Sequence, residues 1–343
     1  MKAAVIDGFG APSEVRIADV GDPLPAPDEV VVRLYAAALN HLDLWTVTGA
    51  LQIPLDFPHV LGADGAGEIE SVGDETRGLQ AGRRVVINPG ISCGGCERCR
   101  AGQQSECADF RLLGEHVPGT FAERVAVPSA NVFPIPDHLD WVHASALGVT
   151  ATTAYRMLFT QGKLTPGEWV LVTGIGGGLG SSLFQLARAV AGRVFVTSSS
   201  DDKLQRALEM GADAGINYRS EDVGKAVRRL TGKRGVDLVV DSAGGPTVDA
   251  SLRALRAGGR LVIAGGTAGR EVTFDVRRLF WNQLHIVGST MGSHSDVSEM
   301  LRMVAGLKLV PEVDRTFSLE EAAEALTYLH EQDQFGKVVL TID

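Results

Sequence analysis

One stretch decides the fold of this chain: Trp169-Val-Leu-Val-Thr173, then Gly174-Ile-Gly-Gly-Gly-Leu-Gly180, then Ser181-Ser-Leu-Phe-Gln-Leu-Ala-Arg-Ala-Val190. The first part is short, apolar and rich in β-branched side chains, which predicts a buried parallel strand. From Leu183 onward, apolar side chains recur at helical spacing, which predicts an amphipathic helix. The glycines between them let a phosphate approach the backbone where the free N–H groups of a helix start attract anions.

The glycine spacing departs from the common GxGxxG pattern. Gly177 and Gly180 hold its second and third positions, but Ile175 takes the first, so that Gly174, Gly177 and Gly180 form GxxGxxG instead. A flexible glycine loop is the alternative interpretation. Because a strand and a helix flank the turn as the pattern requires, we predict a dinucleotide site here.

Length and composition restrict the class of protein to which this chain can belong. At 343 residues the chain is long enough for two domains, and 45% apolar and 22% charged residues exclude a disordered or fibrous protein. A net charge of −10 and the lack of a basic cluster argue against nucleic-acid binding. No apolar run approaches the ~20 residues of a membrane span, and the N-terminus reaches a charge too early for a signal peptide. We therefore expect a cytoplasmic protein with no membrane or nucleic-acid partner.

The first half of the chain reads as short strands between Gly and Pro turns. No segment of helical period and useful length precedes Asp140. These features predict a compact, partly open β-barrel. The expected strands are 2–6, 15–20, 29–38, 67–72, 84–87 and 121–127.

All four cysteines lie in one segment, Cys93-Gly-Gly-Cys96-Glu-Arg-Cys99-Arg-Ala-Gly-Gln-Gln-Ser-Glu-Cys107. The lobe from 92 to 109 has few other apolar side chains, so it cannot fold by burying hydrocarbon. Two disulfides are disfavoured in a reducing compartment, and the long last gap is unusual for an iron–sulfur cluster. Four thiolates around one structural zinc fit best, and no coordination position is left open for chemistry.

From Thr150 onward, strands and helices alternate, which predicts a doubly wound parallel sheet. The expected strands are 193–197, 216–218, 236–241, 261–264 and 285–289, and the expected helices are 202–210, 221–231 and 247–256. After about Thr290, the chain is expected to return to the first half through helices 296–306 and 319–331 and a strand at 337–342. The α/β chain thus divides into a barrel domain (1–149 and 290–343) and a dinucleotide-binding domain (150–289).

The end of the second parallel strand favours NADP(H) over NAD(H). NAD-binding sheets place an acidic residue there to bind the ribose 2′-hydroxyl, but this chain has Ser198, Ser199 and Ser200. Serine hydroxyls can donate to a 2′-phosphate, and Lys203 supplies a nearby cation. Asp201 and Asp202 are better explained as N-cap and first-turn residues. The alternative is that the serines merely fill a turn and that Lys203 is solvated.

Together these motifs resemble those of the medium-chain dehydrogenase/reductase superfamily, which includes zinc alcohol dehydrogenases and quinone oxidoreductases. The resemblance covers essentially the whole chain. It rests on the cysteine lobe, the glycine turn and the segments Ala36-Ala-Ala-Leu-Asn40-His-Leu-Asp43, Pro58-His-Val-Leu-Gly62-Ala-Asp64-Gly-Ala-Gly67-Glu68, Leu147-Gly-Val-Thr-Ala-Thr-Thr153-Ala-Tyr155 and Phe335-Gly-Lys337. It implies a GroES-like catalytic domain, a Rossmann cofactor domain and an active site in the cleft between them.

The resemblance fails at the catalytic zinc of the alcohol dehydrogenases, which is held by Cys, His and Cys. The matching positions look like Asn40, Ala63 and Val149, which offer neither thiolate nor imidazole. A metal site rebuilt from other residues is an alternative, although surface or core-paired roles are favoured for them. The residues that could contribute to it are His41, Asp43, His59, Asp64 and His116.

Loss of this zinc favours a different reaction. Oxidation of an alcohol needs a group that stabilises the alkoxide, whereas reduction of a quinone or enone places charge on an oxygen that hydrogen-bond donors can stabilise. We therefore predict an NADPH-dependent reductase of quinones, enones or related carbonyl compounds that carries one structural zinc. Its candidate catalytic residues are Asn40, His41, Asp43 and Asp64. The alternatives are a zinc-type alcohol or aldehyde dehydrogenase with a rearranged metal site and an inactive nucleotide-binding sensor.

The likeness to zinc-free relatives also implies cofactor contacts. The Asn40 and Asp43 pair is similar to their Asn-x-x-Asp signature, Lys203 and Tyr218 resemble their 2′-phosphate contacts, and Thr153 resembles their nicotinamide contact. The predicted cofactor-binding residues are Thr153, Gly174, Gly177, Gly178, Leu179, Gly180, Ser198, Ser199, Lys203, Tyr218, Gly265 and Lys337. Relatives associate through the sheet edge that corresponds to residues 285–289, which implies a homodimer or homotetramer acting on a small-molecule substrate.

Overall fold

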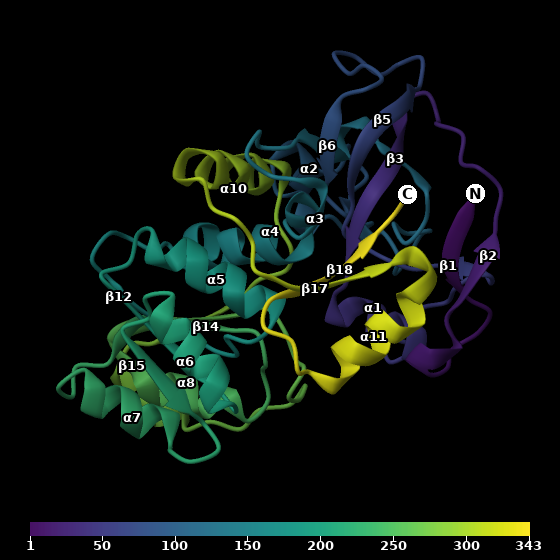
Figure 1. Ribbon diagram of the computed structural model, residues 1–343. Coiled ribbons are helices and arrows are strands. Elements are labelled where there is room, and N and C mark those ends of the chain that lie inside the picture. Colours follow the sequence, from purple (N-terminus) through teal and green to yellow (C-terminus); the bar gives the residue numbers. More distant parts are fainter. The chain divides into compact units, whose positions relative to one another are not determined.

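The computed structural model describes residues 1–343 and divides into two compact units (Figure 1). Unit 1 comprises Met1–Thr152 and Gly292–Asp343, and unit 2 comprises Thr153–Met291. These limits differ by a few residues from the division predicted after residues 149 and 289. Helix α4 (Val149–Tyr155) runs across the first limit.

Unit 1 is built on mainly antiparallel strands. Its largest sheet has the order β10-β6-β5-β3-β18-β17, with β9 paired to β3, and two smaller sheets have the orders β2-β1-β4 and β7-β8. The strands are β1 (Lys2–Ile6), β2 (Arg16–Asp19), β3 (Glu29–Ala38), β4 (His59–Val60), β5 (Ala66–Val72), β6 (Arg84–Ile87), β7 (Gly90–Ile91), β8 (Arg111–Leu112), β9 (Arg124–Pro128), β10 (Val132–Pro134), β17 (Val313–Ser318) and β18 (Lys337–Thr341). The C-terminal strand β18 pairs antiparallel with β3, so the end of the chain returns to the first half.

The core of unit 1 lies inside this arrangement. Its buried apolar residues come from β3, β5, β6, the segment before β9 and the C-terminal segment, and include Leu34, Ile69, Ile87, Phe121 and Leu340. The α-helices are α1 (His41–Thr48), α2 (Glu97–Arg100), α3 (Trp141–Ser145), α4, α10 (His294–Leu307) and α11 (Ala322–Glu331). Short 3-10 segments occur at Pro12–Glu14, Gln104–Glu106, Ser129–Asn131 and Leu319–Glu321.

The expectation that no useful helix precedes residue 140 is wrong, because α1 forms at His41–Thr48. The sequence of this helix has no single apolar stripe from which it could be predicted. Its apolar side chains are distributed around the helix: Leu42, Leu44, Trp45 and Val47. Local chemistry sets its limits instead. Asp43 accepts from the backbone N–H of Asn40 at 2.7 Å, and Gly49 ends the helix with a φ of +68°.

Unit 2 is a parallel sheet with the strand order β13-β12-β11-β14-β15-β16. The strands are β11 (Trp169–Val172), β12 (Arg193–Ser198), β13 (Ala214–Asn217), β14 (Val236–Asp241), β15 (Leu255–Ile263) and β16 (His285–Gly288). The helices are α5 (Gly178–Arg188), α6 (Asp201–Glu209), α7 (Val223–Leu230), α8 (Thr247–Ala254) and α9 (Val276–Trp281), and a π-helical segment covers Arg156–Gln161.

This order confirms the predicted doubly wound sheet. The chain starts at β11, moves outward through β12 to β13, and then returns past β11 to β14, β15 and β16. The reversal therefore lies between β11 and β14, and such a switch point is where open α/β sheets bind ligands. None of the helices has the length and apolar character of a membrane-spanning segment.

Candidate functional site

The glycine turn lies at this switch point, between the end of β11 and the start of α5. Gly174 adopts a φ of +67°, and Gly177 is the N-cap of α5. A Cβ on Gly180 would lie 2.1 Å from the carbonyl oxygen of Gly174, so only glycine lets the helix pack this closely on the turn. The turn therefore has few side chains at the point where α5 presents its first N–H groups, which leaves room for a phosphate to approach the backbone.

The residues predicted to contact a 2′-phosphate gather beside this turn. The side chain of Lys203 lies against Gly176, where a Cβ would be 2.7 Å from Lys203 Cδ and 3.3 Å from Nζ. Ser198 ends β12, and its carbonyl oxygen accepts from the N–H of Tyr218 at 3.1 Å. Ser200 caps α6, which places Asp201 in the first turn rather than at the N-cap.

Two other predicted cofactor residues lie in unit 2 with defined surroundings. Thr153 is buried, and its hydroxyl donates to Met291 Sδ at 3.7 Å. Gly265 follows β15 so closely packed that a Cβ would lie 2.1 Å from the carbonyl oxygen of Ser242. Ser199, Gly178 and Leu179 are half-buried at the ends of β12 and at the start of α5.

Unit 1 contains a buried polar cluster that joins distant segments. The Lys337 ammonium donates to Asn40 Oδ1 at 2.7 Å and to Asp64 Oδ2 at 2.9 Å. The other oxygen of Asp64 accepts from the backbone N–H of Val149, the first residue of α4, at 2.6 Å. The Lys337 and Asp64 side chains are only 3% and 0% exposed. Lys337, which the sequence groups with the cofactor contacts, therefore lies in this cluster.

Asn40 is fully used within the cluster. Its amide nitrogen donates to Asp64 Oδ2 at 3.0 Å and to the Ala38 carbonyl at 3.3 Å, while its oxygen accepts from Lys337. An amide has two N–H groups, so none is left for another acceptor in this arrangement. In this arrangement the Asn40 amide has no N–H group left to donate to a substrate. A substrate contact of Asn40 stays a prediction.

Asp43 lies one helical turn from Asn40, next to this cluster, and one of its carboxyl oxygens has no hydrogen-bond partner. Its Oδ2 accepts from the Asn40 N–H, but its Oδ1 has no partner, and the residue is 1% exposed. Burial raises the pKa of Asp43 to about 7, against the lowering effects of the Asn40 hydrogen bond and the Lys337 charge. The carboxyl group therefore exchanges a proton near neutral pH.

The three candidate histidines of unit 1 have partners outside this cluster. His41 contacts Trp45 edge to face, His59 Nε2 bonds the Gly114 carbonyl at 3.1 Å, and His116 Nδ1 accepts from the Leu112 N–H at 3.2 Å. Burial lowers the pKa of all three, so their neutral forms are favoured. They form no metal-binding group with the acidic residues. In this arrangement the three histidines are not gathered into a metal site, and the rebuilt site stays a prediction.

Glu115 is a candidate that the sequence does not single out. The residue is 7% exposed, its Oε2 has no partner, and burial raises its pKa to about 7. The available signal was the charged pair Glu115-His116 between the apolar residues Leu113 and Val117. Burial of a charge among apolar neighbours is costly, so this pattern indicates a carboxyl group whose pKa is shifted.

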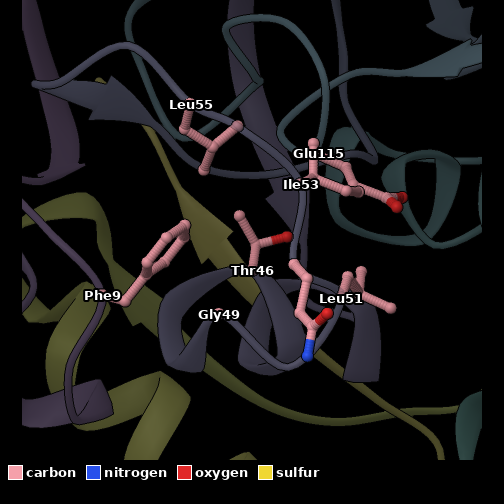
Figure 2. Close-up of a pocket in the computed structure, with 8 residues that line it drawn as sticks. Phe9, Thr46, Gly49, Leu51, Ile53, Leu55 and Glu115 are labelled. Carbon is pink, nitrogen blue, oxygen red and sulfur yellow. The ribbon is translucent and has the colours of Figure 1, made fainter.

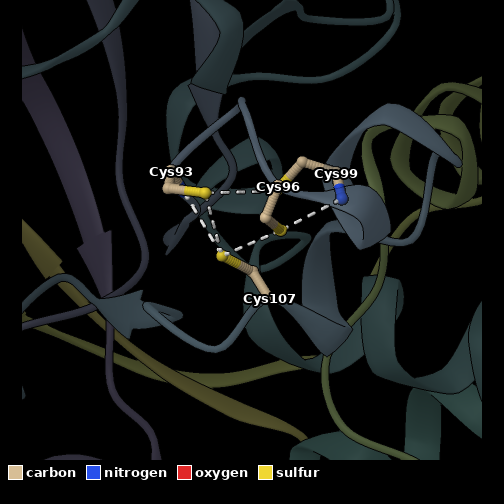
Figure 3. Close-up of side chains that lie close together, drawn as sticks. All are labelled: Cys93, Cys96, Cys99 and Cys107. Carbon is tan, nitrogen blue, oxygen red and sulfur yellow. Dashed lines mark hydrogen bonds between the residues drawn. The ribbon is translucent and has the colours of Figure 1, made fainter.

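The four cysteines converge as the spacing predicts (Figure 3). Their sulfur atoms all lie within 4.8 Å of one another, with Sγ–Sγ distances of 3.5 Å (Cys93–Cys107), 3.9 Å (Cys93–Cys99) and 3.9 Å (Cys96–Cys107), and none forms a disulfide. Tetrahedral zinc with Zn–S bonds of about 2.3 Å places its sulfurs about 3.8 Å apart. The cluster therefore has the shape of a four-thiolate metal site.

A catalytic zinc, in contrast, does not fit the residues of unit 1. The three matching positions hold Asn40, whose amide is committed to Lys337 and Asp64, and Ala63 and Val149, whose side chains carry no ligand atom. An ammonium group bound at the Asp64 carboxylate also disfavours a second cation there.

Comparisons with known proteins identify the family. Residues 26–137 match the alcohol dehydrogenase GroES-like domain, and residues 178–306 match the zinc-binding dehydrogenase family. An NAD-dependent alcohol dehydrogenase of Saccharolobus solfataricus is 31% identical over 99% of both chains, and an acryloyl-coenzyme A reductase of Sulfurisphaera tokodaii is 30% identical over 99% of both. A crystal structure of an NAD-dependent alcohol dehydrogenase aligns over 100% of both chains with 44% identity and a TM-score of 0.94.

None of these relatives is named a quinone oxidoreductase, so their names support the alternative prediction, an alcohol dehydrogenase, better than quinone reduction. They also confirm the predicted pair of a GroES-like and a Rossmann domain. The chain therefore belongs to the zinc-type medium-chain dehydrogenase/reductase superfamily and is an oxidoreductase.

Proposed function

We propose that this oxidoreductase uses a nicotinamide cofactor to reduce carbon–carbon double bonds conjugated to a carbonyl group, as in enones and 2-enoyl thioesters. The observation that carries the proposal is the buried cluster of unit 1, in which protein donors bind Asp64 and the positions matching zinc ligands hold Asn40, Ala63 and Val149. The likeness to an acryloyl-coenzyme A reductase supports the same class of reaction.

The cluster offers what this reaction needs. A nicotinamide cofactor would supply a hydride, whose addition to the β-carbon leaves an enolate with a charge that a hydrogen-bond donor can stabilise. Two N–H groups of the Lys337 ammonium are bound by Asn40 and Asp64, which leaves the third as the donor for the enolate oxygen. The ion pair with Asp64, at 2.9 Å, holds this ammonium in place.

Alcohol dehydrogenation is the second candidate, because two of the three relatives described above carry that name. It demands a base or metal to take charge from the hydroxyl group. Asp43, with a pKa raised by burial to about 7, is the available base. The first candidate function therefore predicts turnover of enones or 2-enoyl thioesters, and the second predicts turnover of alcohols.

The test compares turnover across substrate classes. The purified chain is assayed with NADPH and NADH against an enone, a 2-enoyl thioester, a quinone and an aldehyde, and with NADP⁺ and NAD⁺ against primary and secondary alcohols. Turnover of the enone or thioester without alcohol oxidation supports the proposal. Alcohol oxidation alone overturns it in favour of the second candidate, and tight nucleotide binding without any turnover favours the inactive sensor.

For the nucleotide, the proposal is NADP(H), although the alcohol dehydrogenases above are named NAD-dependent. The position of Lys203 against Gly176, beside Ser198 and Tyr218, supports it. Lys203→Ala should weaken binding of NADPH and leave NADH unchanged in a fluorescence titration. Lys225→Ala, an exposed lysine on α7, is the matched control. Equal losses for both nucleotides would contradict the assignment.

We further propose that the cysteine cluster holds one structural zinc. Its four sulfurs are all used and the lobe has little apolar core, so the metal stabilises the fold and takes no part in the reaction.

A further inference from the structure

Two carboxyl groups of unit 1 are buried with one oxygen each left without a partner: Asp43 Oδ1 and Glu115 Oε2. An unpaired buried carboxylate is costly, so both groups favour the protonated form. Burial raises the pKa of each to about 7, and the charge of Glu115 raises the pKa of Asp43 further. A charge on Glu115 therefore affects the protonation of Asp43 around neutral pH.

Glu115 is one of the residues that line a small hollow in unit 1 (Figure 2). The hollow is small, with about 10 Å³ of space, which is room for roughly one water molecule. Apart from Glu115, its walls are mainly apolar: Phe9, Thr46, Gly49, Leu51, Gln52, Ile53 and Leu55. Glu115 is the one acidic residue among those that line the hollow.

Thr46 lines the hollow and belongs to the same helix as Asp43. It lies three residues after Asp43 in α1, so the two side chains share a face of the helix. Figure 2 shows the Thr46 side chain rising from α1 into the hollow. Its hydroxyl donates to the Leu42 carbonyl at 3.1 Å, which leaves the hydroxyl oxygen available as an acceptor.

No cation neutralises Glu115. His116 Nδ1 lies 3.9 Å from Glu115 Oε1, but that nitrogen accepts from the Leu112 N–H and so has no proton to donate. Asp43 is influenced by Lys337, Asp64 and Glu115. Lys337 is already bound to Asp64 and Asn40, so the unpaired oxygens of Asp43 and Glu115 both remain proton carriers.

We propose that Glu115 resupplies protons from the hollow to Asp43, which donates the proton that completes the reduction. The inference rests on the proposed function, because each hydride added to a conjugated double bond requires one proton at the α-carbon. In that step the Asp43 O–H bond breaks and a C–H bond forms. Glu115 then gives its proton to Asp43 and regains one from water in the hollow. Glu115 acts through Asp43 and does not touch the substrate.

The first test needs no substrate. Infrared difference spectra of the unliganded chain are recorded across roughly pH 5–9, a range that brackets the pKa of about 7 of both groups. The proteins compared are the wild type, Glu115→Gln, Asp43→Asn and the exposed control Glu75→Gln. We expect protonated-carboxyl bands near neutral pH that each of the first two variants removes in part. Glu115→Gln should also lower the apparent pKa of the remaining Asp43 band. An Asp43 band unaffected by Glu115→Gln would overturn the coupling.

The second test measures the pH profile of turnover with the best substrate found. Glu115→Gln should slow kcat at least about tenfold (~1.4 kcal/mol) with a larger solvent isotope effect and little change in KM, while Glu75→Gln matches the wild type. A uniform loss of activity at every pH with an unchanged isotope effect would mean a structural role and overturn the proposal. If no substrate is turned over, the proposed function fails, whereas the infrared titration still decides whether the two carboxyl groups are coupled.

Discussion

At the scale of single residues, the buried ion pair of Lys337 and Asp64 is the most consequential contact in unit 1. Lys337→Met leaves the Asp64 carboxylate buried without its cation, so the free energy of unfolding should fall by about 3–5 kcal/mol. The double variant Lys337→Met/Asp64→Asn removes both charges and should recover most of this loss. Urea unfolding of the three proteins measures the effect. A single variant as stable as the wild type would mean that solvent reaches the pair.

Protonation of Asp43 should appear in the pH dependence of stability. Its pKa is 3.8 as a reference value and about 7 in the folded chain, so between these values the unfolded state has lost the proton that the folded state keeps. Stability should therefore fall as pH rises through this window, by at most about 1.4 kcal/mol per pH unit for this group. Urea unfolding from pH 4 to pH 8 should show a shallower slope for Asp43→Asn. Parallel curves for the two proteins would contradict the shift.

The site residues differ in how far the sequence can reveal them. Asn40 and Asp43 share one motif and Asp64 lies in another, so their spacing marks them as candidates. Lys337 is 297 residues from Asn40, and only the pairing of β18 with β3 brings its ammonium to the cluster. Glu115 belongs to no motif, and its importance arises from burial, which one sequence does not report.

At the scale of elements, the packing of α5 on the glycine turn depends on Gly180. Gly180→Ala would place a Cβ 2.1 Å from the Gly174 carbonyl oxygen and push the helix start away from the turn. We expect NADPH affinity to fall at least about tenfold, or ~1.4 kcal/mol. The control is Gly306→Ala in α10, where a Cβ meets nothing within 4 Å. Isothermal titration of both variants gives the answer, and equal affinities would contradict the role of the turn.

The cysteine lobe makes a separate prediction about metal. Purified protein should contain about one zinc per chain by atomic emission, and Cys107→Ser should lose it. Since the lobe belongs to unit 1, thermal unfolding of that unit should move to lower temperature. NADPH binding by unit 2 should persist. Two zinc ions per wild-type chain would favour the rearranged alcohol dehydrogenase site instead.

Elements with a strong period are predictable, and those without one are not. Most parallel strands of unit 2 are apolar runs, and the strand that the sequence predicts at 236–241 has the observed limits of β14. Helix α1 lacks an apolar stripe, and α9 carries exposed apolar residues, so neither shows the alternation typical of a helix on a core. Pairing across the chain, as in β17 with β18, depends on tertiary contacts.

At the scale of the whole molecule, unit 2 ends in an open sheet edge. Strand β16 is the last in the order, and its outward N–H and C=O groups have no neighbour within the chain. Helix α9, which immediately precedes it, exposes Phe280 and Trp281, the latter by 78%. We propose that a second copy of the chain covers this edge, because a two-fold axis would pair β16 with itself and bury both aromatic side chains.

This association predicts a dimer in sedimentation velocity at micromolar concentration. The double variant Trp281→Glu/Ile286→Lys places unpaired charges on α9 and on the edge strand, so burying them in a symmetric contact becomes costly, and the variant should sediment as a monomer. Leu24→Lys is the control, because Leu24 is an equally apolar residue that is 85% exposed but belongs to unit 1. A monomeric wild type, or a dimer that both variants leave intact, would show that the edge of β16 is not the contact. In the first case the exposed aromatic side chains of α9 would still need another partner.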